Sequence, residues 1–261
     1  MKSKNKLLFI ASLKLAMKIP NKVGLIILFD VLFLVSLLVL QKLFRYFAQS
    51  FVAEITLTFG LILLIFTLIY YLITLLVYSF FKYSILDFIK SLFERTEFSL
   101  NRLGQFYSLN LIIAGIFYAI FLIFGFILEN IKQSYQPLVF IFLAIPYLLF
   151  LYAIINISHS LFYEGASIKE SVKKSFKITF TKIKIYRETI SIMIFFALFL
   201  WILFLGSGYL IRFIASRNYN LYLNVYAYFK QILIIVFWIA FYLAILINRI
   251  SFYKIIKNFQ S

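Results

Sequence analysis

The stretch from Val23 to Gln41 reads VGLIILFDVLFLVSLLVLQ, and it decides the fold class of this chain. It is almost entirely apolar and about as long as the run of roughly 20 residues with which an α-helix crosses the hydrocarbon core of a bilayer. Because lipid offers no hydrogen-bond partner to backbone N–H and C=O groups, an unbroken apolar run of this length is expected to be helical. The stretch therefore predicts a transmembrane helix.

Five further stretches follow the same pattern, and the composition agrees with them. Of the 261 residues, 64% are hydrophobic and 13% are charged, with a mean hydropathy of +1.01. Soluble domains are about 45–50% apolar and about 25% charged, so the composition excludes a soluble globular protein. The sequence predicts an all-α, polytopic membrane protein with six spans: 23–41, 59–81, 108–128, 138–158, 189–211 and 231–248.

The distribution of Lys and Arg predicts the orientation of these spans. The N-terminal segment, the second-to-third connection, the fourth-to-fifth connection and the C-terminal end together carry 20 basic residues, whereas the opposite side carries 6. Cytoplasmic loops carry the excess of basic residues in membrane proteins. Both termini are therefore expected in the cytoplasm. A cleavable signal peptide is not expected, because a full-length span follows the basic start, and the first span is expected to remain as an anchor.

The spans form three pairs, and each pair follows a stretch that is expected to be a cytoplasmic amphipathic interfacial helix. These stretches are about 5–19, 84–103 and 168–186. The third stretch is the clearest, because Ile168, Val172, Phe176 and Phe180 recur every four residues, as on one face of a helix. The whole chain, 1–261, is expected to be a single six-span domain. Its internal repeats would cover 5–81, 84–158 and 168–249, and a similar layout without any repeat stays open as the alternative.

Lysines accompany the apolar residues of the predicted interfacial helices. Such helices bury apolar side chains at the acyl boundary and place lysines near anionic headgroups. We therefore expect the lipid bilayer and anionic lipid headgroups as partners, and a nucleic-acid partner is not expected. The residues predicted to contact headgroups are Lys14, Lys18, Lys169, Lys173 and Lys177.

Two segments resemble one group of prokaryotic membrane proteins. In the segment 163–179 (YEGASIKESVKKSFKIT), the matching residues are Gly165, Ser167, Glu170, Ser171, Ser175 and Phe176. The segment 12–22 resembles the same group's entry into its first span, although Pro20-Asn21-Lys22 stands where Asn-Pro-Lys is usual. The group comprises the membrane domain of some glycerophosphodiester phosphodiesterases and stand-alone six-span relatives. The resemblance implies the six-span fold and a location in the cytoplasmic membrane of a prokaryote. It does not imply phosphodiesterase activity, which in that group belongs to a separate soluble domain.

Asp30 is the acidic residue that lies deepest inside a predicted span. A charged Asp at the bilayer centre costs about 2.5–3.5 kcal/mol on insertion scales, so its side chain is expected to face the interior of the bundle. Asn156 and Tyr78 lie at a compatible depth and complete a candidate intramembrane polar site. No basic residue inside another predicted span is an evident partner. A hydrogen-bonded structural role and a role in proton or cation handling are the two interpretations of Asp30.

Enzymatic chemistry finds little support in the sequence. The chain has no Cys and a single His, His159, which is expected to be a surface or capping residue near the end of the fourth span. No metal, catalytic or cofactor site is predicted, and no cofactor is expected. Pro146 is expected to kink the fourth span. The sequence thus predicts a non-enzymatic protein that organises membrane lipid or supports a complex with a protein partner of unknown identity. The alternative is a small-solute transporter or channel with Asp30 at its polar centre.

Overall fold

The computed structural model is all-helical over the residues that it describes, which are 8–50, 57–96, 98–216 and 219–260. No strand occurs within these ranges. The helices are α1 (Leu8–Lys18), α2 (Pro20–Ser50), α3 (Leu57–Ser91), α4 (Leu100–Glu129), α5 (Gln136–Tyr163), α6 (Ile168–Thr181), α7 (Ile183–Ala215) and α8 (Tyr219–Gln260).

Six of these helices are long and apolar enough to span a membrane, which confirms the predicted number of spans. The protein is therefore a multi-pass membrane protein of the all-α class. The spanning segments are Pro20–Gln49, Gly60–Ser91, Leu100–Glu129, Gln136–Tyr163, Tyr186–Ile214 and Val225–Asn258.

The spans are longer than the hydropathy of the sequence predicts, and in α3 this difference changes a predicted element. The predicted second span stops at residue 81, but α3 continues without interruption to Ser91. The predicted interfacial stretch at 84–103 is therefore not a separate helix, because its first part continues α3 and its last part begins α4. Hydropathy alone places the end of a helix too early when charged residues such as Lys82 fall inside it.

Local sequence signals explain several helix ends. Ile19 separates α1 from α2. It precedes Pro20, and a residue before proline is biased away from helical backbone angles. Pro20 itself suits the first position of a helix. The Ser99 side chain accepts a hydrogen bond from the backbone N–H of Arg102 at the start of α4, at 3.4 Å.

Beyond the end of α5, Gly165 has a φ of +106°. The backbone N–H groups of Gly165 and Ala166 bond to the carbonyls of Phe162 and Leu161, which is the Schellman pattern that favours glycine.

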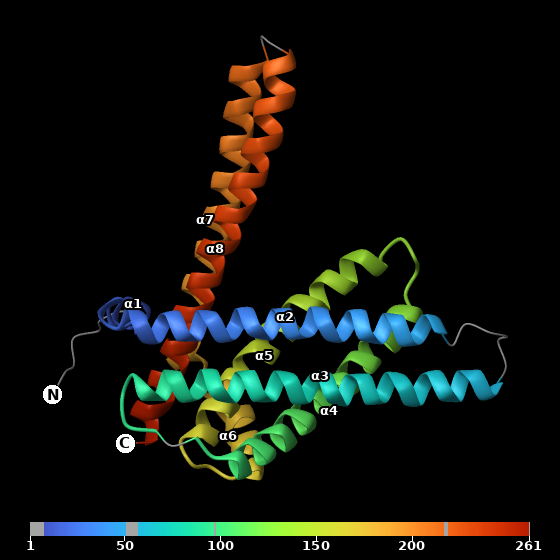
Figure 1. Ribbon diagram of the computed structural model, residues 1–261, viewed down its shortest axis with the longest axis vertical. Coiled ribbons are helices and arrows are strands. Elements are labelled where there is room, and N and C mark those ends of the chain that lie inside the picture. The colour runs from blue at the N-terminus through green and yellow to red at the C-terminus, as the bar shows by residue number, and fades with distance from the viewer. Residues whose placement is uncertain (1–7, 51–56, 97, 217–218, 261) are drawn as a thin grey trace. The chain divides into compact units, whose positions relative to one another are not determined.

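The chain divides into two compact units. Unit 2, Ile19–Thr181, contains α2 to α6. In this unit α2 and α3 run antiparallel and side by side, and α3 also contacts α4 and α5 (Figure 1). Aromatic side chains fix the register of α2 against α3, because Phe29 lies against Phe81 and Phe33 lies against Tyr78, with ring centroids 6.1 and 5.9 Å apart.

Helix α6 packs on α5 and α4 within unit 2. Its buried side chains are Ser171, Ser175, Ile178 and Thr179, whereas Phe180 is 60% exposed. The apolar stripe read from the sequence is therefore not the buried face of α6. Small residues allow close approach between helices in a membrane, and here they place the aromatic side chains at the edge of the contact.

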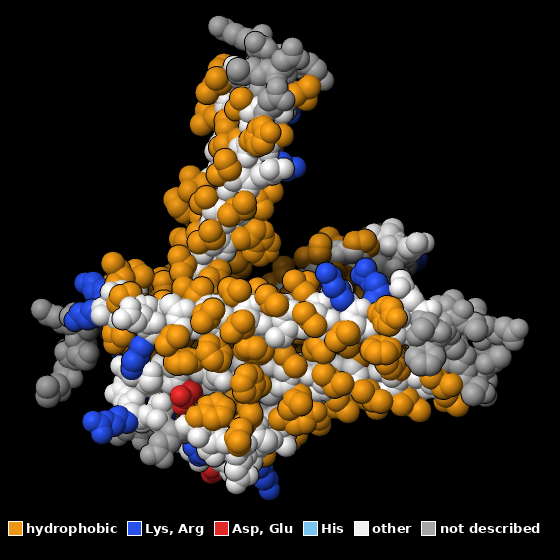
Figure 2. Space-filling model, viewed as in Figure 1, with side chains coloured by type: hydrophobic (Ala, Val, Ile, Leu, Met, Phe, Trp, Pro, Cys, Tyr) orange, Lys and Arg blue, Asp and Glu red, His pale blue; other side chains and the backbone are white. Residues whose placement is uncertain are grey.

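Unit 1, Met1–Lys18 and Lys182–Ser261, contains α1, α7 and α8. Here α7 and α8 form an antiparallel pair, and α1 packs against both (Figure 1). The backbone N–H of Leu8 donates to a carboxylate oxygen of Glu188 at 2.8 Å, which joins α1 to α7. Among the side chains of α8 that the structure describes, the buried ones lie between Ala244 and Ile256. Earlier side chains such as Trp238 are exposed. Figure 2 shows hydrophobic side chains along the visible side of the α7–α8 pair.

Candidate functional site

A chain of hydrogen bonds joins three helices inside unit 2. The Asn110 amide of α4 donates to the Ser79 hydroxyl of α3 at 2.9 Å. The Asn110 carbonyl oxygen lies 2.6 Å from His159 Nε2 of α5. A carbonyl oxygen can only accept, so Nε2 carries the proton in this bond. All three side chains are buried. The bonds therefore tie α3, α4 and α5 together across an apolar interior.

The expectation that His159 is a surface or capping residue is wrong. Its side chain is 0% exposed. The Phe106 ring lies 4.7 Å and the Tyr78 ring 6.3 Å from the imidazole, between centroids. His159 Nδ1 is buried and has no hydrogen-bond partner among the described residues. The sequence places His159 close to the end of its helix, but it does not reveal that α3 and α4 cover this end.

Asp30 of α2 and Lys82 of α3 are charged residues that are buried in unit 2. Asp30 is 8% exposed and Lys82 is 9% exposed. Phe29 packs against Phe81. Because the two helices run antiparallel, Asp30 is level with residue 80, and Lys82 lies two residues, roughly 3 Å, farther along α3. The charge of Lys82 is also close enough to act on the His159 ring. Burying a charge is costly unless a partner compensates it. The polar interior of unit 2 thus includes a basic residue that the predicted span boundaries left outside.

The other two predicted members of the polar site differ in their surroundings. Tyr78 lies between α2 and α5, because its ring is near both Phe33 and His159. Asn156 is buried, and its amide donates to the Tyr152 carbonyl of its own helix at 2.8 Å. The structure therefore brings Tyr78, but not the Asn156 amide, into contact with the chain of bonds around His159.

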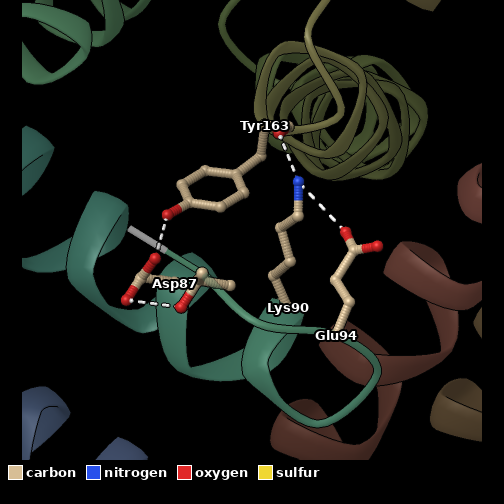
Figure 3. Close-up of polar contacts among 5 residues, drawn as sticks. Asp87, Lys90, Glu94 and Tyr163 are labelled. Atoms are coloured by element: carbon tan, nitrogen blue, oxygen red, sulfur yellow. Dashed lines mark hydrogen bonds and ion pairs between the residues drawn. The ribbon is translucent and has the colours of Figure 1, made fainter. Parts of the chain in front are cut away.

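A second cluster of polar contacts lies where α3 and α5 end (Figure 3). The Tyr163 hydroxyl donates to the Asp87 carboxylate, and Thr96 donates to the other oxygen of that carboxylate at 3.2 Å. Lys90 forms an ion pair with Glu94 at 3.1 Å and donates to the Tyr163 backbone carbonyl at 3.4 Å. We call these residues the Asp87 cluster. It connects the end of α3, the segment that follows α3 and the end of α5.

Described residues of unit 2 line two cavities that are relevant to the site. The first, of about 310 Å³, is between α3, α4 and α5, and its lining includes Tyr78, Asn110 and Tyr147. The second, of about 290 Å³, is between α4, α5 and α6 and is lined almost entirely by apolar and aromatic side chains. Pro146 and Phe176 line this second cavity.

The five lysines predicted to contact headgroups lie on two short helices. They are Lys14 and Lys18 of α1, and Lys169, Lys173 and Lys177 of α6. All five are exposed. Lys174, which the sequence did not single out, lies 3.6 Å from Glu170. Within the described ranges, no three His, Asp or Glu side chains gather as metal ligands would.

Comparison with protein-family models, with curated proteins and with solved structures gives no match for this chain.

Proposed function

We propose that this membrane protein is not an enzyme, and that it organises anionic lipid or supports a protein complex in the cytoplasmic membrane of a prokaryote. In this proposal the six spans form three hairpins, and both termini are cytoplasmic. α1 and α6 are amphipathic helices near the membrane surface. The resemblance to the membrane domain of glycerophosphodiester phosphodiesterases is part of the same proposal.

The observation that carries the proposal is the chemistry of the exposed surface. Long apolar sides of the spanning helices are exposed, including Leu38 of α2 at 59% and Phe199 of α7 at 56%. Five exposed lysines lie on the short helices α1 and α6. Each basic residue near an anionic membrane surface contributes about 1 kcal/mol. In contrast, the buried side-chain amide of Asn110 bonds to Ser79 and His159. These buried polar groups therefore connect α3, α4 and α5 to one another.

The lipid around the protein tests this proposal. The protein is extracted from its own membrane in polymer discs without detergent, and the lipids and proteins in the discs are quantified against the bulk membrane. We expect anionic lipid to be enriched, or a protein partner to be present in stoichiometric amount.

A pair of charge variants sharpens this test. Replacing Lys169, Lys173 and Lys177 with Gln should reduce the enrichment of anionic lipid. Replacing Lys42, Lys132 and Lys230, on the opposite predicted side, removes the same charge and should leave the enrichment unchanged. Discs with the bulk lipid composition and no partner would contradict the proposal.

A second candidate function is transport of a small solute through unit 2. The buried Asp30 of α2 and the buried Lys82 of α3 favour it, together with the cavity lined by Tyr78 and Asn110. Asp30→Asn in reconstituted vesicles tests this candidate, because transport through that carboxylate predicts loss of flux with preserved folding. Unchanged flux would remove Asp30 from any transport mechanism.

A further inference from the structure

The cavity between α4, α5 and α6 is an apolar groove. Its lining includes Phe117 of α4, Phe142, Pro146 and Phe150 of α5, and Phe176 and Phe180 of α6. The Phe117 and Phe176 rings are stacked at 6.4 Å, and the Phe150 and Phe180 rings lie 5.1 Å apart. These pairs place α6 at one end of the groove, and the groove continues along α5 toward Phe142.

The length of the groove matches one lipid acyl chain. The residues of α5 that line it run from Phe142 to Ile154. At about 1.5 Å per residue this stretch covers roughly 18 Å. One leaflet supplies about half of the ~30 Å hydrocarbon core. A single acyl chain that enters beside α6 can therefore lie along the groove.

Positive charge adjoins the α6 end of this groove. Lys173 and Lys177 are exposed, and they precede Phe176 and Phe180 by three residues each. Side chains three residues apart are neighbours on a helix surface. Among the side chains that the structure describes, no carboxylate forms an ion pair with either lysine, whereas Lys174 is paired with Glu170. The basic and aromatic stripes of α6 thus lie side by side.

We propose that this groove binds one anionic phospholipid, with an acyl chain between α4, α5 and α6 and the phosphate at Lys173 and Lys177. The long stems of these lysines can follow apolar surface while their ammonium groups reach the headgroup. The inference rests on the proposed lipid-organising function and gives it a single site. Charge complementarity selects an anionic lipid, because the groove offers apolar surface and two cations.

Photo-crosslinking tests the site. The protein is reconstituted in vesicles that contain phosphatidylglycerol with a diazirine on its acyl chain, and the labelled residues are mapped by mass spectrometry. Phosphatidylcholine with the same label is the comparison. We expect phosphatidylglycerol to label α4 and α5 residues of the groove, and phosphatidylcholine to label them several-fold less.

Two variants separate the headgroup contact from the groove. Lys173→Gln with Lys177→Gln should lower groove labelling by phosphatidylglycerol about fivefold per lysine removed. Lys174→Gln on the same helix should change it less than about twofold, since Glu170 already compensates that charge. Leu143→Trp, which fills the groove, should abolish labelling by both lipids. Leu148→Trp is its control, because Leu148 is 57% exposed and does not line the groove.

The outcomes distinguish the site from the function on which it rests. Enriched anionic lipid in the discs, together with labelling outside the groove or labelling that is insensitive to Lys173 and Lys177, would overturn the site alone. The absence of both enrichment and groove labelling would overturn the site and the proposed function together. Gel filtration and thermal unfolding of each variant check its folding. If Leu143→Trp does not fold, the lysine variants decide the question.

Discussion

At the scale of the residue, Asn110 and His159 explain how polar side chains are accommodated inside an apolar bundle. Asn110 bonds to one residue on each of two other helices. In a membrane an interhelical hydrogen bond contributes about 0.6 kcal/mol on average. A buried group that loses its partner costs about 1–3 kcal/mol.

Asn110→Leu should therefore destabilise the protein by about 1–3 kcal/mol, because Ser79 and His159 both lose a partner. Unfolding by SDS in mixed micelles, followed by circular dichroism, measures this free energy. Ser160→Ala is the control, because the buried Ser160 hydroxyl bonds to the Asn156 carbonyl of its own helix at 2.7 Å. Equal unfolding free energies for Asn110→Leu and wild type would show that the bonds between helices contribute nothing.

The hydroxyl of Tyr163 carries a second prediction at this scale. Tyr163 is 5% exposed and donates to the Asp87 carboxylate (Figure 3). Hydrogen bonds to charged groups contribute about 1.5–3 kcal/mol, so Tyr163→Phe should lower the free energy of unfolding by that amount. Tyr118→Phe makes the same chemical change at a side chain that is 62% exposed and should have little effect.

A double-mutant cycle assigns the effect to this contact. Once Asp87→Ala and Tyr163→Phe are combined, their effects on the free energy of unfolding should not add, because both remove the same bond. Additive effects would show that the two side chains stabilise the protein independently.

At the scale of the element, the sequence predicts which helices exist better than where they end. The six apolar runs are unmistakable, because a spanning helix must be apolar over about 20 residues. The end of α3 is harder to predict. Lys82 looks like a helix boundary in the sequence, although it is buried in the structure. The burial of Lys82 depends on contacts with other helices, and hydropathy along one segment does not contain that information.

Gly165 gives a prediction about how α5 ends. Its φ of +106° is unfavourable for residues with a Cβ atom. Gly165→Ala should therefore destabilise the protein by roughly 1–2 kcal/mol, measured by the same SDS titration. Gly125→Ala is the matched control, because Gly125 lies inside α4 and an added Cβ meets nothing within 4 Å. That change should be neutral or should stabilise by up to about 1 kcal/mol. A Gly165→Ala protein as stable as wild type would contradict the role of this turn.

At the scale of the whole molecule, the candidate site was predictable only in part. The buried position of Asp30 and the nearness of Tyr78 to the polar interior agree with the depth argument from the sequence. The role of Ser79 and the burial of His159 were missed, because they depend on which faces of α3, α4 and α5 meet. Residue depth limits the candidates, but helix rotation decides which of them bond.

The predicted orientation can be tested with single cysteines, because the chain has none of its own. A cysteine in place of Lys169 in α6 should react with a membrane-impermeant maleimide only after the cells are permeabilised. A cysteine in place of Asn130, between α4 and α5, should react in intact cells. The opposite pattern would invert the topology and place the lysines of α6 outside the cytoplasm.

We propose that the protein acts through the lipid or protein that it binds at its surface. Native mass spectrometry of the protein, released gently from its own membrane, tests this proposal because it weighs everything that remains bound. We predict a stoichiometric anionic lipid or a stoichiometric protein partner. A protein that retains neither and carries a small solute would contradict the proposal and favour transport.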